Sequence, residues 1–281
     1  MTVKNPIIAL MYDFDKTLCT KDMQEYNFIP SVGMDAKSFW QASSELAKKN
    51  KMDAILAYML LMLEKARSKH KPIHREDFVI MGKDLELFPG VDSWFERINS
   101  FGKDLGVNVE HYIISSGLRE IIEGSSICSQ FKEIFACEFY YDENGVACWP
   151  KNVVNYTTKT QFLFRINKGV LDLSNDVDLN KFTPQDDRRV PFRNMIYIGD
   201  GLTDVPCMKL VKVNGGYSIA VYQQKKKSKV EELLLDDRVN FIEKADYAEG
   251  SALEMIVQDI IRKMVAEEKL VRENAAQIKK R

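Results

Sequence analysis

The chain has 281 residues, of which 45% are hydrophobic and 29% are charged, so it can bury the core of one large domain or of a domain with a smaller module. Its 40 basic and 41 acidic residues are interspersed and give a formal net charge of −1, which argues against nucleic acid or an anionic membrane as a partner. The five cysteines are scattered without CxxC spacing, and the apolar run before Asp13 is too short for a signal peptide or a membrane helix, so we expect a cytoplasmic protein with free thiols.

The predicted elements begin with Ile7–Tyr12, a short continuous apolar run of the kind that forms a strand covered on both faces. Comparable runs end at Ser115 and at Asp200, and a fourth lies near Tyr217–Tyr222. Helix-like segments alternate with these runs, at 91–101, 118–124, 158–167 and 204–210. Strands that alternate with helices predict an α/β fold with a doubly wound, Rossmann-like and mostly parallel sheet.

The block from residue 21 to residue 87 departs from this alternation, because it has helical patterns and no pair of strands. Its apolar residues recur at helical spacing along one stripe, which comprises Met52, Ile55, Leu56, Met59, Leu60 and Leu63. We therefore predict two domains. Residues 1–20 and 88–281 form the α/β core domain, and residues 21–87 form a small helical domain inserted after the first strand.

Three later segments have patterns of their own. Asn144-Gly145 lies between apolar flanks and predicts a β-hairpin. The polar stretch 171–192 predicts a long surface loop or insertion whose role stays open. Near the C-terminus an amphipathic helix is expected to pack on the core or on a partner chain, although the oligomeric state is not defined by the sequence. Its apolar face comprises Leu253, Ile256, Val257, Ile260, Ile261 and Met264.

Polar side chains follow three of the predicted strands at the point where each ends. They are Asp13 and Asp15 after the first strand, Ser115 and Ser116 after the second, and Asp200 and Asp204 after the later one. Ligands of open α/β sheets bind outside the carboxyl ends of the strands. If the sheet is parallel, Asp13 and Asp200 converge in an oxygen-only pocket that suits Mg²⁺. Such a pocket repels phosphate unless a cation neutralises it, so a phosphate ligand requires the metal.

Four motifs, in this order, resemble those of the haloacid dehalogenase superfamily, whose members are mostly Mg²⁺-dependent phosphatases. "DFDKTL" resembles the DxDx[TV] loop, and "YIISSG" resembles the second motif, a Ser or Thr after a hydrophobic strand. Lys159 in "YTTKTQFLF" resembles the lone Lys of the third motif, and "YIGDGLTD" resembles the fourth, GDxxxD. A DxD pair alone recurs by chance in many proteins, so the specificity lies in four motifs at successive predicted element ends between residues 7 and 247.

The resemblance implies a role for each acid at the strand ends. Asp13 is the expected nucleophile, which forms an aspartyl-phosphate, and Asp15 is the expected general acid and base. Spacing by two residues places both side chains on one side of an extended chain. The expected metal ligands are side-chain oxygens of Asp13 and Asp200 and the backbone carbonyl of Asp15. Asp204 is expected to orient Lys159 or a metal-bound water, and Thr17 to brace the loop by hydrogen bonding.

The phosphoryl group is expected to contact Ser115, with backbone N–H groups of Ser116 and Gly117 as further donors. Ser116 has a second interpretation as a helix N-cap. Lys159 is the expected cation of the phosphate site, because it begins an amphipathic run, whereas Lys168 precedes a glycine and resembles a helix end. Lys168 remains the alternative.

The inserted helical block resembles the C1-type cap of the phosphoserine phosphatase-like branch, which implies a phosphoserine-like substrate. In that branch a carboxylate shortly after the DxD loop holds the substrate amine, and Asp22 or Glu25 could have this role. Asp22 is also interpretable as a helix N-cap. The branch's carboxylate-binding arginine has no clear counterpart, since Arg67 and Arg75 are both only candidates.

The sequence thus predicts a Mg²⁺-dependent phosphomonoester hydrolase that acts on a small phosphorylated metabolite. Dehalogenases and phosphonatases of the superfamily lack an acid at the position of Asp15, so its presence favours chemistry on phosphate esters. Two alternatives on the same scaffold stay open. One is a phosphotransferase or phosphomutase, and the other is a non-catalytic regulatory protein that binds a phosphometabolite.

Overall fold

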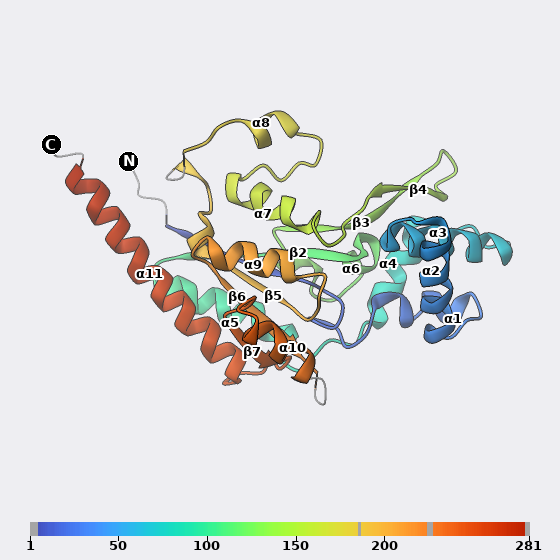
Figure 1. Ribbon diagram of the computed structural model, residues 1–281, viewed down its shortest axis with the longest axis horizontal. Helices are drawn as coiled ribbons and strands as arrows, with labels where there is room; N and C mark the ends of the chain where they lie inside the picture. The colour runs from blue at the N-terminus through green and yellow to red at the C-terminus, as the bar shows by residue number, and fades with distance from the viewer. Residues whose placement is uncertain (1–4, 185–186, 224–226, 279–281) are drawn as a thin grey trace.

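The computed structural model describes residues 5–184, 187–223 and 227–278, and its centre is a seven-stranded sheet in the order β4-β3-β2-β1-β5-β6-β7 (Figure 1). All neighbouring strands are parallel except β4, which is antiparallel to β3. The strands are β1 (Ile7–Tyr12), β2 (Asn108–Leu118), β3 (Glu133–Tyr141), β4 (Ala147–Asn152), β5 (Met195–Gly199), β6 (Tyr217–Tyr222) and β7 (Phe241–Lys244). The predicted α/β fold with a mostly parallel sheet is confirmed.

Strand β1 fixes where the functional edge of the sheet lies. Tyr12, its last residue, is in register with Ile113 of β2 on one side and with Ile198 of β5 on the other. From β1 the chain order proceeds outward in both directions, so the topological switch of the sheet lies at the carboxyl end of β1. The residues that follow β1, β2 and β5 therefore meet at one edge.

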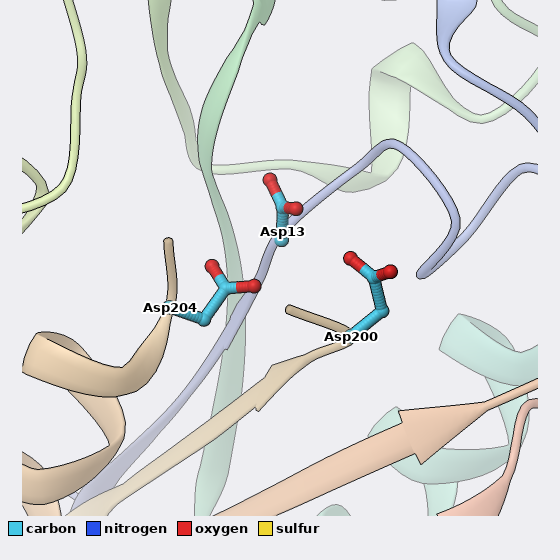
Figure 2. A group of neighbouring side chains, drawn as sticks. All are labelled: Asp13, Asp200 and Asp204. Atoms are coloured by element: carbon cyan, nitrogen blue, oxygen red, sulfur yellow. The ribbon is translucent and has the colours of Figure 1, made fainter. Parts of the chain in front are cut away.

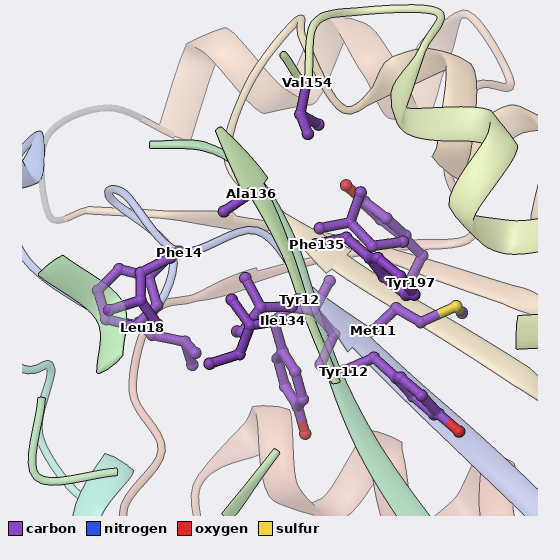
Figure 3. Packing of buried hydrophobic residues seen from close by; sticks show 14 of the residues in the cluster. Met11, Tyr12, Phe14, Leu18, Tyr112, Ile134, Phe135, Ala136, Val154 and Tyr197 are labelled. Atoms are coloured by element: carbon purple, nitrogen blue, oxygen red, sulfur yellow. The ribbon is translucent and has the colours of Figure 1, made fainter. Parts of the chain in front are cut away.

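Helices cover both faces of the sheet. On one face, Trp94 of α5 (Val91–Asp104) donates its indole N–H to the hydroxyl of Tyr12, at 2.9 Å, and α11 (Ala252–Ile278) packs against α5. On the other face, α7 (Lys159–Lys168) and α9 (Val205–Val213) pack against each other and against the sheet. Figure 3 shows Met11, Phe135 and Tyr197 within the core that fills these layers. Helices α6 (Arg119–Glu123) and α10 (Lys227–Leu235) and the short turn η3 (Cys128–Gln130) complete the core.

Residues 21–87, called the insert below, fold into helices and contain no strand among the named elements. They are η1 (Met23–Glu25), α1 (Phe28–Ser31), α2 (Ala36–Asn50), α3 (Ala54–Ser68), α4 (Arg75–Met81) and η2 (Gly82–Asp84). Helices α1 to α3 gather beyond one end of the sheet, far from the C-terminal half of α11 (Figure 1). The predicted apolar stripe is wrong at Leu60, which is 37% exposed, whereas Tyr58, Leu61 and Met62 are buried. Helix α3 is covered on more than one side, so its buried face is wider than a single stripe.

The predicted hairpin is present as β3 and β4, and it joins the insert to the sheet. The N–H of Ala147 in β4 donates to the carbonyl of Ile73 in the insert, and the ring of Phe78 in α4 stacks on Phe139 in β3 with centroids 5.7 Å apart. The insert is therefore held by the hairpin as well as by its two chain connections.

The polar stretch 171–192 is largely exposed where it is described, as expected for a surface insertion, and includes the short helix α8 (Asp176–Asn180) before η5 (Phe192–Asn194). Two of its residues, 185 and 186, lie outside the described part of the chain. The expected apolar face of the C-terminal helix is confirmed, because Leu253, Val257, Ile260, Ile261 and Met264 are buried. Among the described residues, no helix combines the length and the apolar character that crossing a membrane requires.

Two glycines allow the insert to approach the core closely. A Cβ at Gly82 would lie 2.0 Å from the carbonyl oxygen of Ile121 in α6, and one at Gly124 would lie 1.8 Å from the carbonyl oxygen of Val79 in α4. Both obstacles are backbone atoms, so no side-chain rotation relieves them. The contact between α4 and α6 therefore depends on the absence of these two side chains.

We expect Gly124→Ala to lower the free energy of unfolding by about 3 kcal/mol, because overpacking at this contact pushes two backbones apart. Urea denaturation followed by circular dichroism measures the change. Gly201→Ala is the matched control, since the atom nearest to its Cβ, apart from the adjoining residues, would be Thr203 Oγ1 at 3.9 Å. An equal change in the two variants would contradict close backbone contact between α4 and α6.

Candidate active site

Three aspartates meet at the carboxyl edge of the sheet. Asp13 follows β1, Asp200 follows β5, and Asp204 precedes α9. One carboxylate oxygen of each lies within 4.8 Å of the others (Figure 2). The N–H of Asp13 donates to the carbonyl of Ile198 at 2.9 Å, which continues the β1–β5 pairing beyond the strand ends. The convergence expected from a parallel sheet thus occurs.

Lys159, the first residue of α7, lies between two of these acids. Its Nζ is 3.0 Å from Asp13 Oδ1 and 2.7 Å from Asp204 Oδ1, and the side chain is fully buried. The Nζ of Lys168 instead donates to the carbonyls of Leu179 and Lys181 near α8. Of the two lysines considered, the structure brings Lys159 to the site.

Asp204 is fixed by three donors. Besides Lys159, the hydroxyl of Tyr197 donates to Oδ1 at 2.8 Å, and the N–H of Gly201 donates to Oδ2 at 3.2 Å. This carboxylate is fully buried and saturated with hydrogen bonds, so it holds Lys159 in place. Asp204 therefore has the position that was expected of a residue that orients Lys159.

Asp15 lies beside the end of β2. Its Oδ1 accepts the N–H of Met23 at 2.8 Å. A Cβ at Gly117 would lie 2.9 Å from Asp15 Oδ2 and 2.2 Å from the Cε of Met23. Glycine at this position therefore allows β2 to pass close to the DxD loop and brings Asp15 next to the second motif.

The second motif differs in detail from the expectation. The N–H of Gly117 donates to Ser115 Oγ at 3.0 Å, so this proposed phosphate donor is already used in the structure. Ser116 lines a cavity, its Oγ has no partner among the described residues, and its carbonyl accepts the hydroxyl of Tyr58 at 2.7 Å. The N-cap interpretation of Ser116 is wrong, because β2 continues to Leu118 before α6 begins.

Thr17 also differs from the expectation. Its hydroxyl has no hydrogen-bond partner among the described residues, although the side chain is fully buried. The loop is braced through the backbone instead, since the Thr17 carbonyl accepts the hydroxyl of Tyr247 at 2.9 Å and its N–H donates to the carbonyl of Phe14. The preceding residue, Lys16, has a φ of 58°, so the chain turns sharply after Asp15.

The two weaker candidates in the insert have different surroundings. Asp22 occupies the N-cap position of η1 but makes no capping hydrogen bond, and it forms an ion pair with Lys16 at the cavity. Glu25 accepts the indole N–H of Trp40 at 2.8 Å and is not among the cavity-lining residues. The N-cap interpretation of Asp22 is therefore wrong as regards its side chain.

Burial raises the pKa of Asp13 to about 6, and the charge of Asp204 adds to the rise while Lys159 opposes it. For Lys159, burial alone lowers the pKa, but Asp13 and Asp204 outweigh this and raise it above its usual value. The ammonium group is therefore charged at neutral pH.

For the other two acids, burial and neighbouring carboxylates outweigh the effect of nearby cations. Burial, followed by the charges of Asp22 and Asp13, raises the pKa of Asp15 well above its usual range. Burial, followed by Asp13 and Asp204, does the same for Asp200. The Asp200 carboxylate accepts no hydrogen bond and forms no ion pair among the described residues. The site thus holds more negative charge than Lys159 can neutralise.

A cavity of about 840 Å³ opens beside these acids, large enough for a small metabolite. One of its walls comes from the insert and consists of Asp22, Gln24, Trp40, Ile55 and Tyr58; we call it the insert wall. Gln24, Trp40 and Tyr58 were not predicted from the sequence, because no motif marks them. The helical spacing in the insert indicated core packing and gave no signal that some of these side chains face a cavity.

No family model matches the sequence. An uncharacterized protein of Borreliella burgdorferi is 29% identical in an alignment that covers 90% of this chain and 96% of that protein. Among solved structures, a probable phosphoserine phosphatase from Vibrio cholerae has a TM-score of 0.59 at 15% identity, covering 95% of this chain and 67% of its own.

A HAD family hydrolase from Salmonella enterica serovar Typhi has a TM-score of 0.57 at 16% identity, covering 86% of this chain and 68% of its own. A substrate-bound phosphoserine phosphatase has a TM-score of 0.54 at 12% identity, covering 86% and 95%. The chain has the haloacid dehalogenase (HAD) fold. These likenesses extend over most of the chain.

We expect Lys159→Met to lower the free energy of unfolding by about 3–5 kcal/mol, because it leaves two buried carboxylates without their cation. Lys168→Met is the matched control and should cost about 1 kcal/mol, since it removes hydrogen bonds near the surface. Urea denaturation without added metal compares the two. Equal stability of the two variants would contradict a buried ion pair at Lys159.

Proposed function

We propose that this protein is a Mg²⁺-dependent phosphomonoester hydrolase that acts on a small phosphorylated metabolite through an aspartyl-phosphate intermediate. One observation carries the proposal: on a HAD fold, the carboxylate of Asp13 is paired with the buried Lys159, lies within 4.8 Å of Asp200, and lines a metabolite-sized cavity. A fixed carboxylate beside a fixed cation is suited to attack an anionic phosphoryl group.

The acids present fit a magnesium ion. Asp13 and Asp200 would hold it through side-chain oxygens, and Asp15 through its backbone carbonyl. The unpaired carboxylate of Asp200 and the raised pKa of both side chains are the features that a divalent cation would relieve. When bound, the ion neutralises carboxylate and phosphoryl charge, so that a phosphate ester can approach.

The acids divide the chemistry between them. An oxygen of Asp13 attacks phosphorus and forms an acyl phosphate, while the bond from phosphorus to the ester oxygen breaks. Burial and neighbouring acids raise the pKa of Asp15, which suits it to donate a proton to the departing alkoxide. Asp15 then takes a proton from water, which attacks phosphorus, releases inorganic phosphate and restores Asp13.

Other groups hold the substrate during these steps. We assign the phosphoryl oxygens to the Ser115 hydroxyl, the Ser116 hydroxyl and the Lys159 ammonium. We also propose that the insert is a cap domain, residues 21–87, on a core of residues 1–20 and 88–281. The hydrogen bond from Tyr58 of the insert to the Ser116 carbonyl would then fix the position of the cap relative to the phosphate site.

We expect a cytoplasmic enzyme, because all five cysteines are free and three of them are buried. No observation favours the phosphotransferase or the non-catalytic alternative over hydrolysis. Release of free phosphate from phosphomonoesters separates the three, since a transferase requires an added alcohol and a binding protein shows no turnover.

We expect Asp13→Asn to reduce the turnover of p-nitrophenyl phosphate roughly 1,000-fold, because the amide is a poor nucleophile toward phosphorus. Phosphate release with added Mg²⁺ is the measurement, and beryllofluoride should inhibit the unmodified protein. Asp259→Asn, at an exposed aspartate of α11, is the control. Turnover by Asp13→Asn at the level of this control would rule out Asp13 as the nucleophile.

We expect Mg²⁺ to stabilise the protein by about 2.7 kcal/mol at roughly 100 times its dissociation constant, because it binds the folded site only. Thermal melting with and without Mg²⁺ measures this effect, and a chelator should reverse it. Asp200→Asn should lose most of the stabilisation. If Mg²⁺ raised the melting temperature of Asp200→Asn as much as that of the unmodified protein, the metal would bind elsewhere.

A further inference from the structure

The cavity has an apolar side that none of the proposed chemical steps uses. Trp40 of α2 and Ile55 and Tyr58 of α3 line it from the insert, and Tyr156, which precedes α7, lines it from the core. Trp40 and Ile55 are partly exposed, and Tyr156 is 45% exposed. Apolar and aromatic side chains that remain open to a cavity form the usual contact surface for the apolar part of a small ligand. We call these four residues the apolar subsite.

The polar atoms of two of its rings are already engaged within the protein. The indole N–H of Trp40 donates to Glu25 at 2.8 Å, and the hydroxyl of Tyr58 donates to the Ser116 carbonyl at 2.7 Å. The two rings lie edge to face, with centroids 5.9 Å apart. Because both donors are used, what Trp40 and Tyr58 offer a ligand is ring surface.

Tyr156 belongs to a segment that is held to both the insert and the phosphate site through its neighbour Asn155. The side-chain amide of Asn155 donates to Asp53 Oδ2 at 2.5 Å, and Asp53 Oδ1 accepts the N–H of Ile55 at 2.8 Å at the start of α3. The carbonyl of Asn155 accepts the N–H of Lys159 at 2.8 Å. These hydrogen bonds fix the segment that carries Tyr156 relative to both α3 and Lys159.

The acid that would protonate the leaving alcohol borders the insert. Asp15 Oδ1 accepts the N–H of Met23 in η1 at 2.8 Å, and Asp15 and Tyr58 line the same cavity. The alcohol portion of a phosphomonoester begins at the oxygen that receives this proton, so it starts beside the insert wall. Asp22 of that wall is paired with Lys16 at 2.5 Å, so its negative charge is matched within the protein.

We propose that the apolar subsite binds the alcohol portion of the substrate and that Trp40 and Tyr156 are specificity-determining residues. The substrate class is a phosphomonoester whose alcohol carries an uncharged apolar group. This inference rests on the proposed phosphatase function and names the substrate class of the same site.

Three esters test the class. Ethyl phosphate and neohexyl phosphate have alcohols of similar acidity and differ in the size of the apolar group. Phosphocholine has the shape of neohexyl phosphate, but a charged nitrogen replaces one carbon. We expect kcat/KM of the Mg²⁺-loaded protein to be at least about tenfold higher for neohexyl phosphate than for ethyl phosphate, because the subsite buries the added carbons. It should also exceed the value for phosphocholine.

Two pairs of variants test the residues. Tyr156→Ala and Trp40→Ala should each lower the ratio of kcat/KM for neohexyl phosphate to that for ethyl phosphate by at least about threefold, because each removes ring surface from the subsite. Tyr140→Ala and Trp149→Ala are the matched controls, since these rings are 56% and 70% exposed on the hairpin and are not among the described residues that line the cavity. The controls should keep the ratio of the unmodified protein, and so should Tyr156→Phe, which retains the ring. Thermal melting of every variant verifies that the fold is intact.

Hydrolysis of p-nitrophenyl phosphate separates failure of this inference from failure of the phosphatase function. While that ester is still hydrolysed, three results would overturn the inference. They are equal kcat/KM for neohexyl and ethyl phosphate, a higher kcat/KM for phosphocholine than for neohexyl phosphate, and a ratio that both Tyr156→Ala and Trp40→Ala leave unchanged. Absence of turnover with every ester, p-nitrophenyl phosphate included, would instead overturn the phosphatase function, and this inference with it.

Discussion

The site depends on one buried ion pair network, in which Lys159 lies between Asp13 and Asp204. Lys159 comes from the start of α7, Asp13 from the end of β1, and Asp204 from the start of α9. A fully buried ammonium group is tolerated only when its partners are fixed and close. The network therefore requires that α7 and α9 pack together on the same face of the sheet, and it holds Asp13 in one orientation. The remaining acids, Asp200 and Asp15, make this edge suited to a divalent cation and to a proton donor.

The cavity beside this network joins two chemically different regions. Its core end is rich in carboxylates, from Asp13, Asp15 and Asp200, and includes Ser116. Its insert wall offers the rings of Trp40 and Tyr58. The hydrogen bond between Tyr58 and the Ser116 carbonyl links the regions, and the glycines at Gly82 and Gly124 let the insert lie close against the core. The two ends of the cavity thus come from separate parts of the chain.

The sequence could predict the core end because its signals are local. Apolar runs that end in Asp13 and Asp200 define strand ends, whereas β2 continues past Ser115 to Leu118. Parallel pairing then brings these segments together. The helix start at Lys159 and the glycine after Lys168 distinguished the two lysines. Trp40 could not be predicted, because its place in the cavity wall depends on how the insert returns across the sheet edge. The N-cap interpretation of Ser116 failed for a related reason, since the extension of β2 is set by pairing with β3 and by the close approach of Gly117 to Asp15.

The central claim is that Asp13 becomes phosphorylated during turnover, and borohydride trapping tests it most directly. The protein is quenched while it hydrolyses p-nitrophenyl phosphate with Mg²⁺, reduced with borohydride, digested and analysed by mass spectrometry. An acyl phosphate at Asp13 is reduced to the alcohol, so we predict homoserine at position 13 and at no other aspartate. An unmodified Asp13 under conditions of measured turnover, or reduction at a different aspartate, would contradict the account.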